Sequence, residues 1–505
     1  MKGRTTVVTA VLVTALLISA VSSALAAADT EEKQYTEAYV QPPAHWHDIN
    51  TEWMDLFHHP MENVEMGLDL RLREVYARNI FSVNESFGDN VAAPYEAGNW
   101  NNYHWQRYRT RWSLKYMMSP DVDFNMRLVW EFWGHCAPEH SFNPFFSETN
   151  YDFDEAIFDH FNIQWRNVMD MPLTLTVGRQ DIILGTGWLV LDGTPADGSR
   201  TIFFDAIRAQ YQLTDATNLD MIYIQQYDDE DRYIKPFNHG AVANRRHLTN
   251  KADERGFIFY LTNKAESGQQ RELYYIYKNE EPSEWNEHYG TGAGISADIH
   301  TIGGRLSGPI NDNWSYSAEM AKQWGSRNGE TQRGLGANTR LMYAFNDPKN
   351  NEVHVGYEYL SGDDPDTTGT DEKFDTLWGD WPQYQRGGDL QSYLWTFEGA
   401  LGEVTNLHRL GVGHSFKPND VWTINTDYNL MWADETNPGP LGAAPLGANT
   451  LTDHNFRGHM ISGLATYSCC KKFRTQFMLD YFIPGEYYQT RDDAFFARIN
   501  LEWTF

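Results

Sequence analysis

The chain has few cysteines and few basic residues for its length. Only three cysteines, Cys136, Cys469 and Cys470, occur among 505 residues. This odd, sparse set cannot form a disulfide framework, and adjacent cysteines bond to each other only with strain, so we expect free thiols. Lysine and arginine number 40 against 69 aspartate and glutamate, which gives a formal net charge of -29. This acidity argues against nucleic acid as a partner, because nucleic-acid binding requires basic patches.

Long apolar runs are missing after the first segment of the chain. Residues 7–20 are apolar apart from scattered Thr and Ser; they follow Lys2 and Arg4 and precede small residues at 24–28. This arrangement is typical of a secretory signal peptide, so we predict that residues 1–28 are removed on export. A transmembrane anchor is the alternative, but the run is short and no stop-transfer pattern follows it. No other stretch approaches the length of a membrane-spanning helix.

Motifs of catalysis and of metal or nucleotide binding are also missing. The sequence contains no G-x-S-x-G, H-E-x-x-H, P-loop or C-x-x-C-H pattern. We therefore predict no cofactor and no enzymatic activity, with a barrel enzyme kept as an alternative. Four histidines near the N-terminus match no standard metal motif and are interpreted as solvated, with a metal-ligand set as the alternative: His45, His47, His58 and His59.

Aromatic residues, by contrast, are abundant in a polar chain. They make up 14% of the residues, including 18 Trp and 28 Tyr, although the mean hydropathy is -0.58. A transmembrane β-barrel combines these properties, because aromatic girdles lie at both membrane interfaces while the inner face stays polar. From Phe495 to Phe505, apolar residues occupy every second position, which places them on one face of a strand. Similar alternation occurs at 66–73, 121–132, 422–432 and 473–481.

The connections between the alternating segments are of two kinds. Short turns are predicted at 119–121, 214–217, 309–313, 347–350, 417–420 and 468–471. Long polar segments lie at about 81–102, 133–155, 181–202, 227–254, 279–295, 325–335, 362–405, 433–455 and 484–492. We therefore predict an all-β fold over 66–505: a closed antiparallel transmembrane barrel of about eighteen strands with short periplasmic turns and long extracellular loops. Residues 29–65 are predicted to form a periplasmic extension.

Because the apolar parity of each strand faces lipid, the other parity is predicted to line the lumen. On the early strands this parity is rich in arginine: Arg71, Arg73, Arg107, Arg109, Arg111, Arg127, Arg166 and Arg208. One interpretation is an anion-attracting stripe, because guanidinium is always charged and binds carboxylate or phosphate in a bidentate manner. The other is a network of pairs with Asp69, Asp123 and Glu131 that stiffens the wall.

The late strands carry a different set on the same parity. It is rich in carboxylates: Glu319, Glu352, Glu358, Asp427, Asp480 and Glu502. We therefore predict a lumen that is basic on one arc and acidic on the other, which orients water and polar solutes. The aromatic stretch 378–384 in a long loop is interpreted either as a lid or sugar-stacking platform, or as a plug folded on the barrel mouth.

Three motifs, in their order and separation, resemble those of the alginate export family of outer-membrane porins. The first runs from Val177 through Arg179 to Gly185 and resumes at Arg200 and at 203–208, the sequence FFDAIR. The others are TIGGRLSG at 301–308, and EYLSGD at 358–363 followed by FDTLW at 374–378. The resemblance implies a monomeric eighteen-stranded barrel with an electropositive, arginine-lined constriction gated by a long loop and a periplasmic turn. It places Arg179 and Arg208 at matching motif positions, and Asp205, in the same motif, joins the predicted lumen-lining residues.

Together these observations predict a porin of the outer membrane that passes polar solutes, in particular anionic sugars or polysaccharide. A general diffusion porin or an abundant structural outer-membrane protein is the alternative. The predicted partners are outer-membrane lipid and lipopolysaccharide, the cargo, and the insertion machinery that recognises a C-terminal strand ending in Phe505. The protein is expected to be a monomer.

Overall fold

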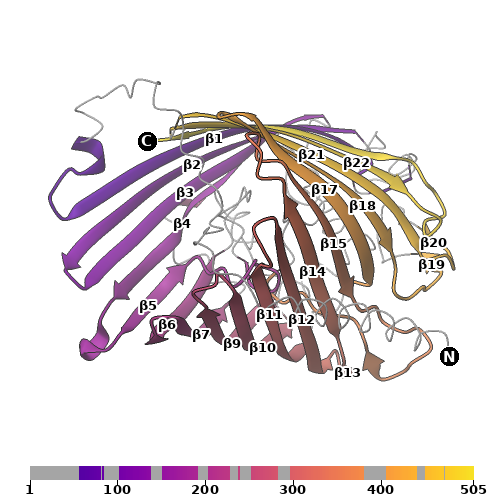
Figure 1. Cartoon of the computed structure of the whole chain (residues 1–505), viewed down its shortest axis with the longest axis horizontal. Coiled ribbons are helices and arrows are strands. Elements are labelled where there is room, and N and C mark those ends of the chain that lie inside the picture. The colour runs from indigo at the N-terminus through magenta and orange to yellow at the C-terminus, as the bar shows by residue number, and fades with distance from the viewer. Residues whose placement is uncertain are drawn as a thin grey trace.

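The structure is a computed structural model, and it describes residues 56–80, 82–84, 102–137, 151–191, 203–227, 237–238, 252–282, 296–379, 405–440, 450–470 and 472–505. Within these ranges, 18 long strands form one closed wall (Figure 1). They are β1 (Val64–Arg78), β2 (Asn102–Ser119), β3 (Val122–Ala137), β4 (Tyr151–Trp165), β5 (Leu173–Gln180), β6 (Phe204–Thr214), β7 (Thr217–Gln226), β9 (Ala252–Lys264), β10 (Gln270–Pro282), β11 (Ala297–Pro309), β12 (Trp314–Arg327), β14 (Leu335–Ala344), β15 (Glu352–Leu360), β17 (Leu407–Asn419), β18 (Trp422–Trp432), β21 (Phe456–Cys470), β22 (Phe473–Pro484) and β23 (Ala494–Thr504).

Short elements also occur in addition to the 18 long strands. They are η1 (Val168–Asp170), β8 (Phe237–Asn238), β13 (Glu330–Gln332), β16 (Thr370–Asp371), β19 (Gly439–Pro440) and β20 (Thr450–Leu451). Among the residues that the structure describes, no helix is long and apolar enough to cross a membrane.

Each long strand pairs antiparallel with the next, and the last pairs with the first. In the closing pair, Asp69 lies opposite Thr504 and Arg78 opposite Phe495. The Phe505 backbone N–H donates to the Leu68 carbonyl at 2.7 Å. Closure leaves no unpaired edge in the wall, which a sheet surrounded by lipid requires. The predicted fold class and strand number are confirmed.

The two ends of the barrel differ in their connections. All six predicted short turns lie at one end, together with the C-terminus, and two further turns at 166–172 and 265–269 join them there. We call this the short-turn end. The nine predicted long segments connect strands at the opposite end, which we call the long-loop end. Because neighbouring strands are antiparallel, alternate connections lie at opposite ends. The even number of strands places the start of β1 and the end of β23 at the same end.

The outer face of the wall is apolar, as the alternation predicts. On β1, Leu72 is 42% exposed, while its neighbours Arg71 and Arg73 are buried. On β22, Leu479 is 56% exposed, while Met478 and Asp480 are buried. Outward apolar side chains are compatible only with a surrounding that is itself apolar, so the wall is built to lie in lipid.

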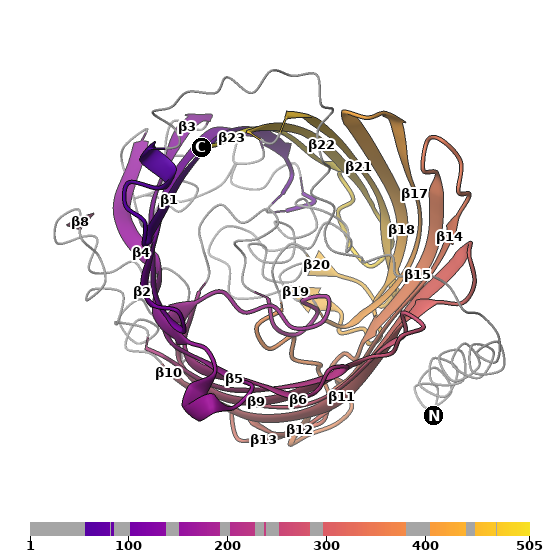
Figure 2. The same ribbon diagram turned by 60° about the vertical axis from the view of Figure 1, so that its left-hand side comes forward.

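Two segments from the long-loop end leave the wall and fold into the ring (Figure 2). Residues 181–191 follow β5, and residues 361–379 follow β15. The Trp188 ring stacks on Phe374 with centroids 5.6 Å apart, and Val190 bridges to Trp378. These side chains join the buried apolar cluster on the inner face of the wall. Trp378 is thus packed inside the barrel, as in the plug interpretation. Residues 380–384 of the predicted aromatic stretch lie outside the described residues.

The remaining sequence predictions concern the cysteines and the N-terminal region. Cys136, Cys469 and Cys470 are free thiols, with the two adjacent sulfur atoms 3.6 Å apart, as predicted. The predicted signal peptide, His45 and His47 lie outside the described residues. Within the described ranges, no group of three or more His, Cys, Asp or Glu side chains is arranged to hold a metal ion.

Candidate functional site

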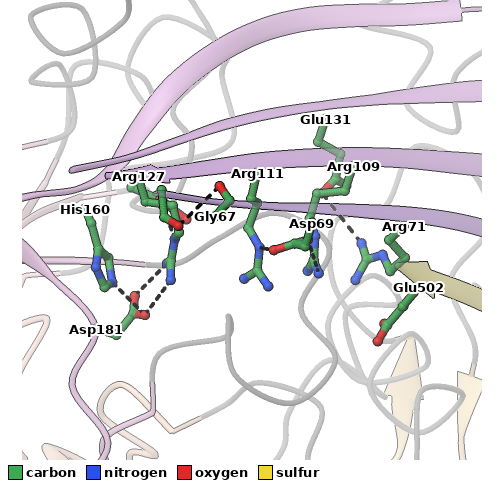
Figure 3. A network of polar contacts seen from close by, with 12 residues as sticks. Gly67, Asp69, Arg71, Arg109, Arg111, Arg127, Glu131, His160, Asp181 and Glu502 are labelled. Atoms are coloured by element: carbon green, nitrogen blue, oxygen red, sulfur yellow. Dashed lines mark hydrogen bonds and ion pairs between the residues drawn. The ribbon is translucent and has the colours of Figure 1, made fainter. Parts of the chain in front are cut away.

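Arginines gather on the inner face where β1 and β2 meet. The register places three rows side by side: Asp69 opposite Arg111, Arg71 opposite Arg109, and Arg73 opposite Arg107. Positions that differ by two share a face, so all six side chains project to one side of the sheet. Figure 3 shows the Arg71, Arg109 and Arg111 side chains extending from this wall beside Asp69.

Two carboxylates each serve two of these arginines. Asp69 accepts from Arg111 Nε at 2.5 Å and from Arg109 Nη2 at 3.3 Å. Glu131 on β3 accepts from Arg107 Nη2 at 2.7 Å and lies 3.7 Å from Arg71 Nη2. Each carboxylate can neutralise only one guanidinium, and among the described residues each group has two guanidiniums and one carboxylate.

Two more arginines of this wall, one on β1 and one on β22, contact β23. Arg73 donates from Nε to the neutral amide oxygen of Asn500 at 2.7 Å. Arg474 donates to Glu502 at 2.8 Å. We define the arginine arc as Arg71, Arg73, Arg107, Arg109, Arg111 and Arg474 with Asp69, Glu131 and Glu502. Among the described residues, this part of the inner wall therefore carries six cations and three anions.

Arg127 forms a separate group with the first inward segment. Its Nε donates to Asp159 at 2.8 Å, and its two terminal nitrogens donate to Asp181 at 3.1 Å each. His160 Nε2 lies 2.6 Å from the same Asp181 carboxylate (Figure 3). Asp181 is the first residue after β5, so this ionic contact anchors the start of residues 181–191 to β3 and β4.

Arg166 and Arg208 stand outside the arc, and each contacts a carboxylate; the acid of Arg166, Asp123, also lies 3.5 Å from Lys115. Arg166, beyond the end of β4, donates to Asp123 at 2.6 Å, and this hydrogen bond raises the pKa of the guanidinium. Arg208 donates to Asp220 at 2.7 Å. The Arg208–Asp220 pair carries no net charge, so it contributes little to the field in the lumen.

Arg179 and Asp205 form a bidentate pair with both distances at 2.9 Å. The register places them opposite each other, on the parity of Val177 and Ile207, whose side chains are on the outer face. The Arg179 guanidinium is buried over the Phe203 ring at 3.6 Å. The structure therefore shows a neutral pair that joins β5 to β6, away from the arginine arc.

The inner face of β9 to β12 carries an excess of carboxylates. The buried groups are Glu254, Glu272, Glu280 and Glu319, with Lys278 and Arg305. Arg305 binds Glu272 through two nitrogens at 2.7 Å, and Lys278 lies 3.4 Å from Glu254. The order of the strands places β10 to β12 half-way round the ring from β23, β1 and β2. We call this group the acidic arc.

The sequence prediction placed the acidic side later in the chain and included only Glu319 from this group. Of the late carboxylates, Glu358 contacts Arg409 at 2.6 Å and Asp427 contacts His354 at 2.8 Å. Alternation on β10, where Glu272, Lys278 and Glu280 share one parity, is the signal that could have identified the acidic arc.

The inward segments cover part of the acidic arc and also contact β15. Trp378 Nε1 donates to Glu254 at 2.8 Å, and Lys278 donates to the Leu377 carbonyl at 3.1 Å. Gly185 packs so closely that a Cβ there would lie 2.6 Å from the Tyr260 hydroxyl. Trp188 Nε1 donates to Glu358 at 3.0 Å. Glu254 and Glu358 thus accept hydrogen bonds from the inward segments, whereas the arginine arc lies on the opposite wall.

A closed barrel with an apolar outer face, a charged inner face and chain segments folded into its lumen defines a channel protein of the outer membrane. The model of the alginate export family matches residues 64–501. The chain therefore belongs to the alginate export family, and the predicted resemblance is confirmed.

Solved structures share the fold at low sequence identity. Pseudomonas aeruginosa OpdO is similar with a TM-score of 0.53 and 9% identity, over 89% of this chain and 99% of that chain. A BenF-like porin from Pseudomonas fluorescens Pf-5 has a TM-score of 0.52 and 10% identity, over 88% of this chain and 99% of that chain. The comparison with curated proteins gave no match.

Proposed function

We propose that this channel passes anionic solutes, namely anionic sugars or polysaccharide, along the arginine arc. The observation that carries the proposal is the sharing of one carboxylate by two arginines, at Asp69 and again at Glu131. A wall with two cations for each anion attracts negative solutes, and guanidinium forms bidentate hydrogen bonds with carboxylate groups.

The position of the two inward segments also favours selectivity for anions. Trp378 donates to Glu254, and Gly185 packs against Tyr260 and Glu272, so these segments cover part of the acidic arc. Within an aqueous pore the field of a charge is screened over about 8 Å at physiological salt. Selectivity therefore depends on the charged wall that a solute passes closely.

A general diffusion porin is the second candidate. It is favoured by the one-to-one pairs at Arg179 and Arg208, which indicate that part of the wall charge is structural. In that case the arc also serves mainly to hold β1, β2 and β3 together.

Reversal potentials across planar bilayers in a salt gradient distinguish the two functions. The triple variant Arg107→Gln, Arg109→Gln, Arg111→Gln removes three positive charges from one strand. We expect anion preference to fall, most strongly at low ionic strength, because screening then extends further. The double variant Arg208→Gln, Asp220→Asn is the control, since it removes a balanced pair without changing the net charge, and its selectivity should stay close to that of the unchanged protein.

Equal reversal potentials for the triple variant and the unchanged protein at low salt would reject the anion channel in favour of the general porin. Heat-modifiable migration in gels must first show that both variants fold.

The proposal also covers the export, orientation and oligomeric state of the protein. We infer that residues 1–28 are a cleaved signal peptide, that residues 29–65 lie largely in the periplasm, and that the short-turn end faces the periplasm. The protein acts as a monomer in a membrane that contains lipopolysaccharide, after delivery by the insertion machinery.

A further inference from the structure

A groove lies on the outer face of the wall, across β6, β7, β9 and β10. Its volume is about 570 Å³, and it is lined by Ile207, Tyr223, Arg255, Phe257, Tyr277 and Asn279. Ile207 is 45% and Phe257 47% exposed, so both side chains are on the lipid-facing parity. The groove is separate from the lumen, because lumen-facing residues occupy the alternate positions of the same strands.

The register divides the groove into two levels. The lower level is a cross-strand row of rings and one aliphatic side chain: Ile207, Tyr223, Phe257, Tyr277, His300 and Trp324. The upper level, two residues nearer to the long-loop end, is a polar row: Gln225, Arg255, Asn279 and Asp298. Aromatic side chains concentrate at the interface of a barrel with its membrane, so the polar row lies at the level of the lipid headgroups.

Arg255 is the candidate anion-binding residue of the upper level. It is the one cation among the six residues that line the groove. Asp298 already accepts from the Tyr277 hydroxyl at 2.7 Å and from Asn279 at 3.1 Å. Glu281 lies 3.5 Å from Arg255, and both side chains are about half exposed. An exposed pair of this kind is weak, so the guanidinium can bind an anionic group at the rim.

We propose that the groove binds a phosphorylated acyl lipid of the outer leaflet, of the lipid A type. One acyl chain lies on Ile207 and Phe257, and a headgroup phosphate binds Arg255, because guanidinium binds phosphate in a bidentate manner. Tyr223 and Tyr277 flank the chain at the boundary between the two levels. An apolar floor beneath a single guanidinium matches an amphiphile rather than a free anion.

Native mass spectrometry of the delipidated full-length protein in detergent, titrated with bis-phosphorylated lipid A, tests the proposal. Arg255→Gln should weaken binding about tenfold, the loss expected for one charge-assisted contact. Ile207→Trp, which fills the groove from its floor, should also weaken binding. Arg271→Gln is the control: it removes an exposed cation from the same sheet at the short-turn end, and binding should be unchanged.

The ligand supplies a second test. Lipid A that lacks its phosphates should bind the unchanged protein as weakly as Arg255→Gln binds the intact lipid, with no further loss in the variant. Phosphatidylglycerol that binds as tightly as lipid A would overturn the assignment to the outer leaflet. Displacement by inorganic phosphate alone, or tight binding by Ile207→Trp, would overturn the lipid groove. Conductance depends on the lumen and should be the same for all three variants.

Discussion

At the scale of single residues, the inner wall depends on carboxylates that are shared. Glu131 is buried between the guanidiniums of Arg107 and Arg71, at 2.7 Å and 3.7 Å. Removing its charge leaves two buried cations without their common counter-ion, and such a change costs about 3–5 kcal/mol. We therefore expect Glu131→Gln to lower the midpoint of unfolding in a denaturant titration followed by heat-modifiable migration.

Two comparisons isolate this effect. The double variant Glu131→Gln, Arg107→Gln should recover part of the stability, because it removes one of the two cations together with the acid. Glu502→Gln should cost less, since its partner Arg474 is 42% exposed and can be solvated. If Glu131→Gln unfolds at the same denaturant concentration as the unchanged protein, the shared carboxylate does not stabilise the wall.

At the scale of elements, residues 181–191 form a strut across the lumen. Asp181 fixes one end to Arg127, and Trp188 fixes the other to Glu358. Between them Gly185 has φ of 60° and lies against Tyr260 and Glu272. Only a residue without Cβ fits this position, both because of the contact and because positive φ disfavours other residues.

Gly185→Val should therefore displace the strut while leaving the wall strands paired. We expect single-channel currents of the variant to become larger and noisier, because the displaced segment no longer holds one position in the lumen. Gly369→Val is the matched control: Gly369 has φ of 76°, but a Cβ there would meet nothing within 4 Å. Equal currents from Gly185→Val and the unchanged protein would show that the strut does not limit conduction.

The sequence allows prediction of the strands better than of the contacts between them. Lipid outside the wall requires an apolar parity, so alternation alone identified which face of β1 and β22 is inward. The turns at 166–172 and 265–269 were not among the six predicted short turns, although Asn167, Asp170 and Gly268 have positive φ and are of residue types that favour turns. Only Met169, which also has positive φ, departs from that pattern.

Contacts between charged side chains depend on register, which composition does not contain. Arg109 and Arg111 share Asp69 only because β1 and β2 pair at that offset. At Arg179 the local backbone matters as well, since Gly178 has φ of 118° and β4 is irregular near His160. Parity could therefore predict a positive wall but not which arginines are balanced by an acid.

At the scale of the whole molecule, the difference between the two ends predicts how the barrel is oriented. A tag inserted at Gly369, in a long loop, should be labelled by antibody on intact cells. A tag at Asn350, in the turn between β14 and β15, should be labelled only after the outer membrane is opened. Labelling of Asn350 on intact cells would invert the proposed orientation.

The seam between β1 and β23 also determines when folding can finish. It joins residues 69–78 to residues 495–504, so nearly the whole chain separates the two partners. Until the last strand has been synthesised and exported, β1 presents an open edge that can pair with other chains. Contacts between such distant residues form slowly. The newly made polypeptide must therefore be kept from aggregating in transit, and the step that closes the ring is also the step that ends this danger.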